Sequence, residues 1–101
     1  MTFTNPPGTC ARCRRLRAFL DANIATHPDW HNAPVPSFGA LEAGLLIVGL
    51  APGLRGANRT GRPFTGDYAG DLLYPTLLTF GLAEGTYDQR PDDGLRLTGA
   101  R

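Results

Sequence analysis

The sequence contains no lysine, and all ten of its basic residues are arginine. Arginine binds phosphate through paired hydrogen bonds and stacks on flat rings, so this composition is compatible with nucleic-acid binding. A codon bias that also enriches alanine, glycine and proline explains the missing lysine equally well, but it does not explain why the arginines cluster. The clusters are Arg12, Arg14, Arg15 and Arg17 near the start, and Arg55, Arg59 and Arg62 in a later loop.

Long apolar runs are also missing, since no stretch approaches the roughly 20 residues of a membrane span. The segment MTFTNPPGTC at the start lacks the basic and apolar regions of a signal peptide. We therefore expect a cytoplasmic protein with no membrane partner, whose two cysteines stay reduced unless they bind a metal or do redox chemistry. With 101 residues, 42% of them hydrophobic, the chain suits one small globular domain, which we expect to be a monomer.

The first predicted element is a helix over residues 10–26, for which Thr9 can serve as the N-cap. Its apolar positions have the i, i+3, i+4, i+8 spacing of one buried face: Leu16, Phe19, Leu20 and Ile24. Pro28 ends this helix, and the loop over residues 27–39 is expected to be anchored by Trp30 and Phe38. The histidines on either side of that loop's tryptophan are read as surface or capping groups more readily than as catalytic ones.

A strand is predicted over residues 41–48, because the continuous run LLIV is typical of a strand buried on both faces in a parallel sheet. A helix is predicted over residues 71–80 with Gly81 as its left-handed terminal residue, although Pro75 would kink it outside the first turn. Residues 82–94 are read as a polar loop, and residues 95–101 as the beginning of a second strand. This order is half of an α/β sandwich. Because a two-strand sheet is marginal alone, we expect a fragment of a larger domain.

The richest stretch is the glycine-dense loop that follows the predicted strand, over residues 49–70. In open α/β sheets, ligands bind beyond the carboxyl ends of the strands. The loop lacks GxGxxG and GxxxxGK[ST], so the familiar nucleotide-phosphate motifs do not apply. It does hold side-chain donors for phosphate oxygens or base edges. These are Arg55, Asn58, Arg59, Thr60 and Arg62.

Phe64 and Asp67 add an aromatic face and a carboxylate to this loop, separated only by the small pair Thr65-Gly66. Such a set fits an enzyme that holds an extruded nucleobase between an aromatic face and backbone donors. A carboxylate near the sugar can position water and stabilise the cation that forms as an N-glycosidic bond breaks. The alternative is a glycine-rich surface loop in which Phe64 belongs to the core and Asp67 caps the next helix.

The segment GLAPGLRGANRTGRPFTGD closely resembles the first active-site motif of the uracil-DNA glycosylase superfamily. It is most similar to the family 5 (type b) bacterial and archaeal enzymes, which carry GLAP-x-x-x-G-x-NRTGR-x-FTGD. The resemblance extends to the PVPSFG loop, to the CARC segment and to the helix that follows the motif. Family 4 enzymes have an acidic residue where Leu50 stands and usually lack the FTGD carboxylate, so Leu50 and Asp67 both favour family 5.

The resemblance implies the N-terminal part of a three-layer α/β/α sandwich with a central, mostly parallel sheet, incomplete in this chain. It also implies hydrolytic, monofunctional removal of uracil from DNA, with residues 1–101 as a partial domain that is inactive alone. Asp67 would act on the attacking water, and Phe64 would stack on the base. The pocket would be lined by Gly49, Leu50, Ala51, Pro52 and Gly53, with Asn58 beside it. Asn58 and the motif arginines would support the loop or touch DNA phosphate, and the candidate phosphate contacts are Arg55, Arg59 and Arg62.

The two cysteines, Cys10 and Cys13, form a lone CxxC motif, which is a weak signal by spacing alone. It fits half a zinc or iron–sulfur site, a redox pair or two buried thiols, and the strand that precedes a thioredoxin-like redox pair is absent. The resemblance implies two of the four ligands of a [4Fe–4S] cluster, the other two being downstream of this sequence. Two alternatives stay open: a catalytically inactive chain that binds DNA weakly through its arginines, and a small CxxC metal- or redox-binding module.

Overall fold

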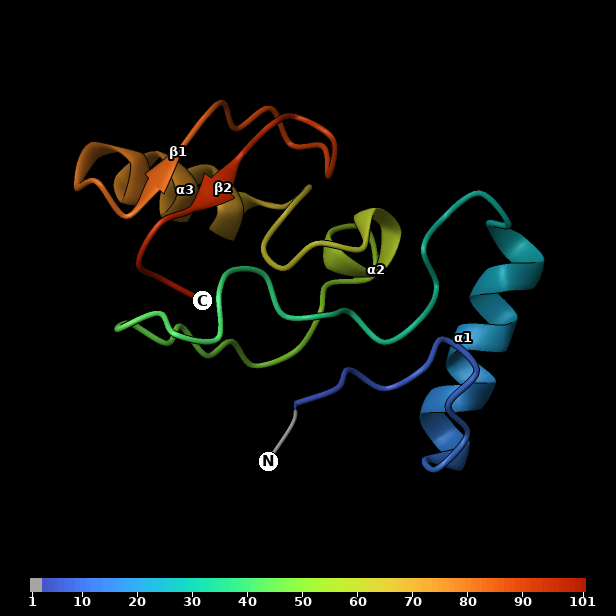
Figure 1. Ribbon diagram of the computed structural model, residues 1–101. Coiled ribbons are helices and arrows are strands. Elements are labelled where there is room, and N and C mark those ends of the chain that lie inside the picture. The colour runs from blue at the N-terminus through green and yellow to red at the C-terminus, as the bar shows by residue number, and fades with distance from the viewer. Residues whose placement is uncertain (1–2) are drawn as a thin grey trace.

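The computed structural model describes residues 3–101, which form mixed helical and sheet structure of the α/β class (Figure 1). In chain order the elements are α1 (Arg14–Thr26), α2 (Ala57–Thr60), α3 (Tyr68–Thr79), β1 (Ala83–Glu84) and β2 (Arg96–Leu97). The two strands pair antiparallel, with Ala83 opposite Leu97, and α3 packs against β1. No helix in residues 3–101 is long and apolar enough to cross a membrane.

Helix α3 has a capping interaction at each end. Asp67 caps its start by accepting a hydrogen bond from the Gly70 amide at 3.4 Å. Gly81, at a φ of 75°, ends it as predicted, with its amide donating to the Leu78 carbonyl at 3.3 Å. The helix begins three residues before the predicted residue 71, because the cap lies at Asp67. Pro75 therefore lies well inside the helix and outside the first turn.

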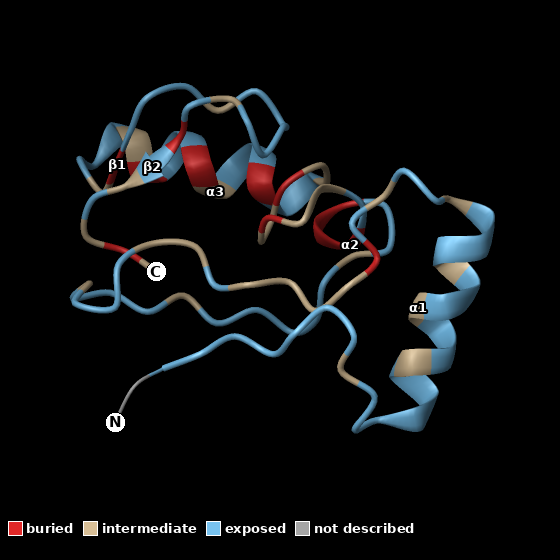
Figure 2. Cartoon of the chain, turned by 45° about the vertical axis from the view of Figure 1, so that its right-hand side comes forward, coloured by how far each residue is buried: buried red, intermediate tan, exposed pale blue. Residues whose placement is uncertain are grey.

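The core lies along one side of α3. Its buried apolar members are Tyr74, Leu77, Ala83, Leu95 and Ala100. Figure 2 places the buried residues on α3, on α2 and on the segments that run beside them. The small size of this core follows from the short sheet, which covers only one face of one helix.

The predicted strand over residues 41–48 is wrong as a strand buried on both faces. Leu46 and Val48 are 68% and 80% exposed. The segment is extended and pairs in parallel with residues 99–101: the Leu45 amide donates to the Gly99 carbonyl at 3.2 Å, and the Ile47 amide donates to the Arg101 carbonyl at 2.7 Å. In the described residues the run has one neighbouring segment and no layer across its outer face, so its apolar side chains stay in contact with solvent. The predicted parallel direction is retained.

Helix α1 differs from its prediction in start and in burial. It begins at Arg14, because residues 7–10 form a turn in which the Cys10 amide donates to the Pro7 carbonyl, and Thr9 does not cap it. Its apolar face is about half exposed at Leu16, Phe19 and Ile24, so the expected burial of this face is wrong. Within residues 3–101, α1 contacts no other helix or strand, and it stands apart in both views (Figures 1 and 2).

Candidate functional site

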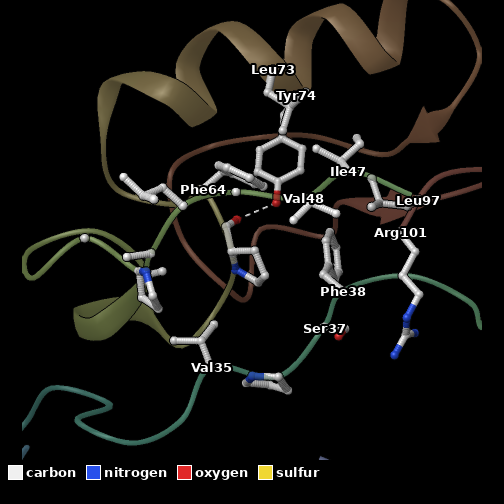
Figure 3. Close-up of a pocket in the computed structure, with 18 of the residues that line it drawn as sticks. Val35, Ser37, Phe38, Ile47, Val48, Phe64, Leu73, Tyr74, Leu97 and Arg101 are labelled. Carbon is white, nitrogen blue, oxygen red and sulfur yellow. Dashed lines mark hydrogen bonds between the residues drawn. The ribbon is translucent and has the colours of Figure 1, made fainter. Parts of the chain in front are cut away.

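A cavity of about 420 Å³ opens between the glycine-rich loop, the segment 35–38 and the inner side of α3 (Figure 3). This volume is in the range of small-ligand pockets. The predicted site residues that line it are Gly49, Leu50, Ala51, Pro52, Gly53, Phe64 and Asp67. Apolar side chains from the extended segment and from α3 complete the lining, among them Ile47, Leu73 and Leu77.

The Phe64 side chain lines the cavity, and the backbone conformation of this residue is unusual. Its φ of 54° is in the left-handed region, which a bulky residue seldom adopts. The ring lies so close to Gly49 that a Cβ on Gly49 would come within 2.9 Å of the Phe64 Cζ atom. A glycine is therefore needed at this point of the loop, because any side chain would push the ring away. The ring also contacts the core, so the two readings of Phe64, core residue and pocket face, both hold.

Asp67 is half-buried and uses its two carboxylate oxygens differently. Oδ1 accepts the capping hydrogen bond of α3, as the alternative reading predicted. Oδ2 lies beside Gly53 and Gly56, where added Cβ atoms would be 3.1 Å and 2.5 Å away. These two glycines leave room for the carboxylate, which lies at the cavity and is held there by the start of the helix.

The backbone of residues 49–51 is free to meet a ligand. Within residues 3–101, none of these amides donates a hydrogen bond to another part of the protein. Further along the loop, the Gly53 carbonyl accepts a hydrogen bond from the Asn58 amide at 2.9 Å. The loop therefore offers unpaired N–H groups over a short stretch that ends just before Pro52.

Arg62 does not face solvent, which corrects its predicted contact with phosphate. It is 5% exposed and makes a two-point ion pair with Asp93, with N–O distances of 2.8 and 2.9 Å. Its guanidinium lies over the ring of Phe38 at 5.2 Å and that of Tyr74 at 5.5 Å. The hydrogen bonds from Arg62 hold the pKa of Asp93 well below its usual range.

Asn58 also differs from its predicted place beside the ligand, because it is buried and does not line the cavity. Its amide group donates to the Asn32 side chain at 3.1 Å and to the Leu54 carbonyl at 3.3 Å. The Asn32 amide in turn donates to the Asn58 carbonyl at 3.1 Å. Asn58 therefore ties the loop before the motif to α2.

Arg55 and Arg59 remain exposed, as a phosphate contact requires. Arg59 lines a second, shallower hollow together with Trp30, His31 and Arg90. The Arg55 guanidinium lies 5.9 Å from the centre of the Trp30 ring. The two sides of α2 thus differ, since Ala57 lines the main cavity and Arg59 faces the second hollow.

Cys10 and Cys13 are free thiols in the segment before α1, one half-buried and one exposed. A [4Fe–4S] cluster takes four thiolates, and the chain has two cysteines. No group of three or more histidine, cysteine, aspartate or glutamate side chains in the described residues could hold a metal ion. The residues present therefore do not complete such a cluster.

Sequence reasoning missed Tyr74 as a residue that lines the cavity, and Asp93 as the partner of Arg62. Asp93 lies 31 positions after its partner Arg62, in a segment that reads as a polar loop. The one available signal was charge: the late segment is acidic and the motif is rich in arginine, so an ion pair between them was a reasonable expectation. Tyr74 carried no signal beyond its place in a helical segment.

The fold is of the α/β class, with an extended segment paired in parallel. Beyond that segment lies a glycine-lined cavity with a helix-capping carboxylate at its wall. Comparison with known sequences makes this specific. The uracil DNA glycosylase superfamily matches residues 36–98, and the chain belongs to that superfamily.

Three relatives, each named a type-5 uracil-DNA glycosylase, confirm the resemblance to family 5. The Thermus thermophilus protein is 46% identical over 96% of this chain and 46% of its own length. The Pyrobaculum aerophilum protein is 38% identical over 94% of this chain and 44% of its own length. The Mycobacterium bovis protein is 47% identical over 86% of this chain and 35% of its own length. The chain thus spans less than half the length of these relatives.

Proposed function

We propose that this chain supplies one wall of the uracil site of a type-5 uracil-DNA glycosylase, an enzyme that hydrolyses the N-glycosidic bond of uracil in DNA. The observation that carries the proposal is the meeting of the Phe64 ring and the Asp67 carboxylate in one cavity behind Gly49. A flat base needs a stacking face, and the bond to its sugar needs a water molecule held by an acid or base.

In this proposal the extruded base lies against Phe64 with its polar edge toward the free amides of residues 49–51. Cleavage leaves negative charge on the base and positive charge on the sugar. The Asp67 carboxylate positions the attacking water, takes its proton as the new bond forms, and stabilises the sugar cation. The helix cap supports this role, because it fixes one oxygen of Asp67 and leaves the other at the cavity.

Arg55 and Arg59 are the proposed contacts for DNA phosphate, since both are exposed. Their side chains come from α2 and the turn before it, which separate the base cavity from the second hollow. We propose that residues 1–101 form the N-terminal part of a three-layer α/β/α sandwich. The parallel pairing of residues 45–47 with residues 99–101 supports this architecture.

Cys10 and Cys13 are proposed as two ligands of a [4Fe–4S] cluster whose remaining thiolates come from outside these residues. Their CxxC spacing and their free thiols support this assignment. No step of the proposed reaction depends on such a cluster.

The test uses this chain and a single-stranded oligonucleotide that carries one uracil, with a thymine-containing oligonucleotide as reference. We expect tighter binding of the uracil strand and no uracil release by the 101-residue chain. Phe64→Ala should remove the preference for uracil, whereas Phe80→Ala, an exposed phenylalanine at the end of α3, should keep it. Equal affinity of the unaltered chain for both strands contradicts the proposal, and measurable uracil release refutes the expectation of inactivity.

Asp67 is tested in a polypeptide that spans the full length of the family. Asp67→Asn should slow uracil release by a large factor with little change in DNA binding, because asparagine still caps α3 but cannot take a proton from water. Unchanged release would remove Asp67 from the mechanism. A catalytically inactive DNA-binding chain would instead bind both strands equally, and its affinity would fall steeply with salt.

A further inference from the structure

Phe64 has a left-handed backbone conformation, and the residues directly before and after it are fixed by hydrogen bonds from other side chains. Such a conformation is costly for a residue with a side chain, and it persists only where the surroundings impose it. We propose that Tyr74 and Arg62 are positioning residues for Phe64, which keep its ring against Gly49. The reading of that ring as a base platform rests on the proposed function, but the positioning itself does not.

The support before Phe64 comes from Tyr74. Its hydroxyl donates a hydrogen bond to the Pro63 carbonyl, the peptide oxygen that directly precedes Phe64 (Figure 3). Tyr74 is 1% exposed, and its ring packs edge-on against Phe38 and at 5.0 Å from the Tyr87 ring. Burial raises the pKa of Tyr74 to about 12, so the hydroxyl keeps the proton that it donates.

The support after Phe64 comes from Arg62. Its Nε–H donates to the Thr65 Oγ1 atom at 2.8 Å, and Thr65 is completely buried. The rest of the guanidinium is fixed by the two hydrogen bonds to Asp93. Asp93 is held in turn by the amides of Asp88 at 2.7 Å and Leu95 at 3.0 Å. The loop before β2 is thereby locked to the residue that follows Phe64.

The first turn of α3 closes the remaining side. A Cβ on Gly70 would overlap the Phe64 carbonyl oxygen, so the helix backbone lies directly against that peptide. Phe64 is therefore confined by the group before it, the group after it and the helix beside it. We expect the ring to be in place before any base arrives, which lowers the cost of ordering it on binding.

The test follows the Gly49 α-hydrogen that points along the direction of the missing side chain, because that direction leads to the Phe64 ring. In NMR spectra of the unaltered chain, this hydrogen should show a downfield ring-current shift, because it points at the ring edge at Cζ and Cε1, and a cross-relaxation peak to the ring. Both signals should be lost in Tyr74→Phe and in Arg62→Lys. Each variant has a matched control that makes the same chemical change at an exposed site: Tyr68→Phe on α3 and Arg96→Lys on β2.

Retention of both signals in folded Tyr74→Phe and Arg62→Lys would overturn the proposal, as would their loss in both controls. Asp93→Asn is a further near-isosteric variant should either of the two fail to fold, and it should lose the signals in the same way. A purely stabilising role would lower the unfolding midpoint and leave both signals in the folded protein unchanged.

A second measurement links the positioning of Phe64 to base binding, namely the ratio of affinities for the uracil and thymine strands. Tyr74→Phe should lower this ratio by about tenfold, since the Pro63 carbonyl then keeps only the hydrogen bond from Thr65 Oγ1 and the ring is less firmly held. If the unaltered chain shows no preference for uracil, the proposed function fails while the NMR signals still decide the positioning role. If the ratio is unchanged in a variant that has lost both signals, the link between ring position and base binding is refuted.

Discussion

Helices α1 and α3 are of similar length and both have an apolar face, yet only α3 is covered. Tyr74 and Leu77 of α3 are buried against β1 and the segment after β2, whereas the apolar residues of α1 are about half exposed. The difference is one of partners, because α3 is followed closely by the chain that covers it and α1 is followed by an irregular loop. Periodicity therefore identifies the face that can be buried, while the rest of the fold decides whether it is.

The largest expected difference in unfolding free energy between the covered and the exposed region concerns two arginine–aspartate pairs. Arg62→Ala leaves the fully covered Asp93 carboxylate without a partner, and we expect a loss of about 3–5 kcal/mol in the free energy of unfolding. Arg17→Ala, which breaks the partly exposed pair with Asp21 on α1, should cost less than about 1 kcal/mol. Urea denaturation measures both, and comparable losses would refute the contrast.

The next effect compares apolar residues of the two helices. Leu77→Ala opens a cavity in the core and should cost about 2–5 kcal/mol. Phe19→Ala on α1 should change the free energy of unfolding by about 0.5 kcal/mol or less, because its ring is about half exposed. A loss above about 2 kcal/mol for Phe19→Ala would mean that α1 is covered in solution.

The smallest effect is a pH dependence. Because the pKa of Asp93 is lowered in the folded state, its contribution is fully present above the ordinary aspartate pKa of about 3.9. That contribution falls as the pH drops below this value, since the unfolded chain then binds the proton more readily. Unfolding followed from pH 6 to about pH 2 should therefore show a steeper decline for the unaltered chain than for Asp93→Asn. Parallel declines would show that the ion pair does not set the acid stability.

Local signals allowed α1, α3 with its end at Gly81 and the parallel direction of the 45–47 pairing to be predicted, whereas α2 and β1 lie in segments predicted to be loop. The motif indicated Phe64 and Asp67, and both line one cavity. The exposure of residues 46 and 48 could not be predicted, because burial depends on a second layer that periodicity does not report. Arg62 was misplaced for a related reason: its partner is distant in sequence, and an arginine in a loop gives no sign of being buried.

The pairing of residues 45–47 with residues 99–101 has a consequence for the order in which the site is assembled. Its hydrogen bonds join residues more than fifty positions apart, and the cavity lies between these segments and α3. Helices form from local contacts, but this closure must first overcome the entropy of a long loop. During synthesis, α1 and α3 can form as soon as they emerge, whereas the pocket cannot close until residue 101 has left the ribosome. The cavity is thus the last part of this region to take shape.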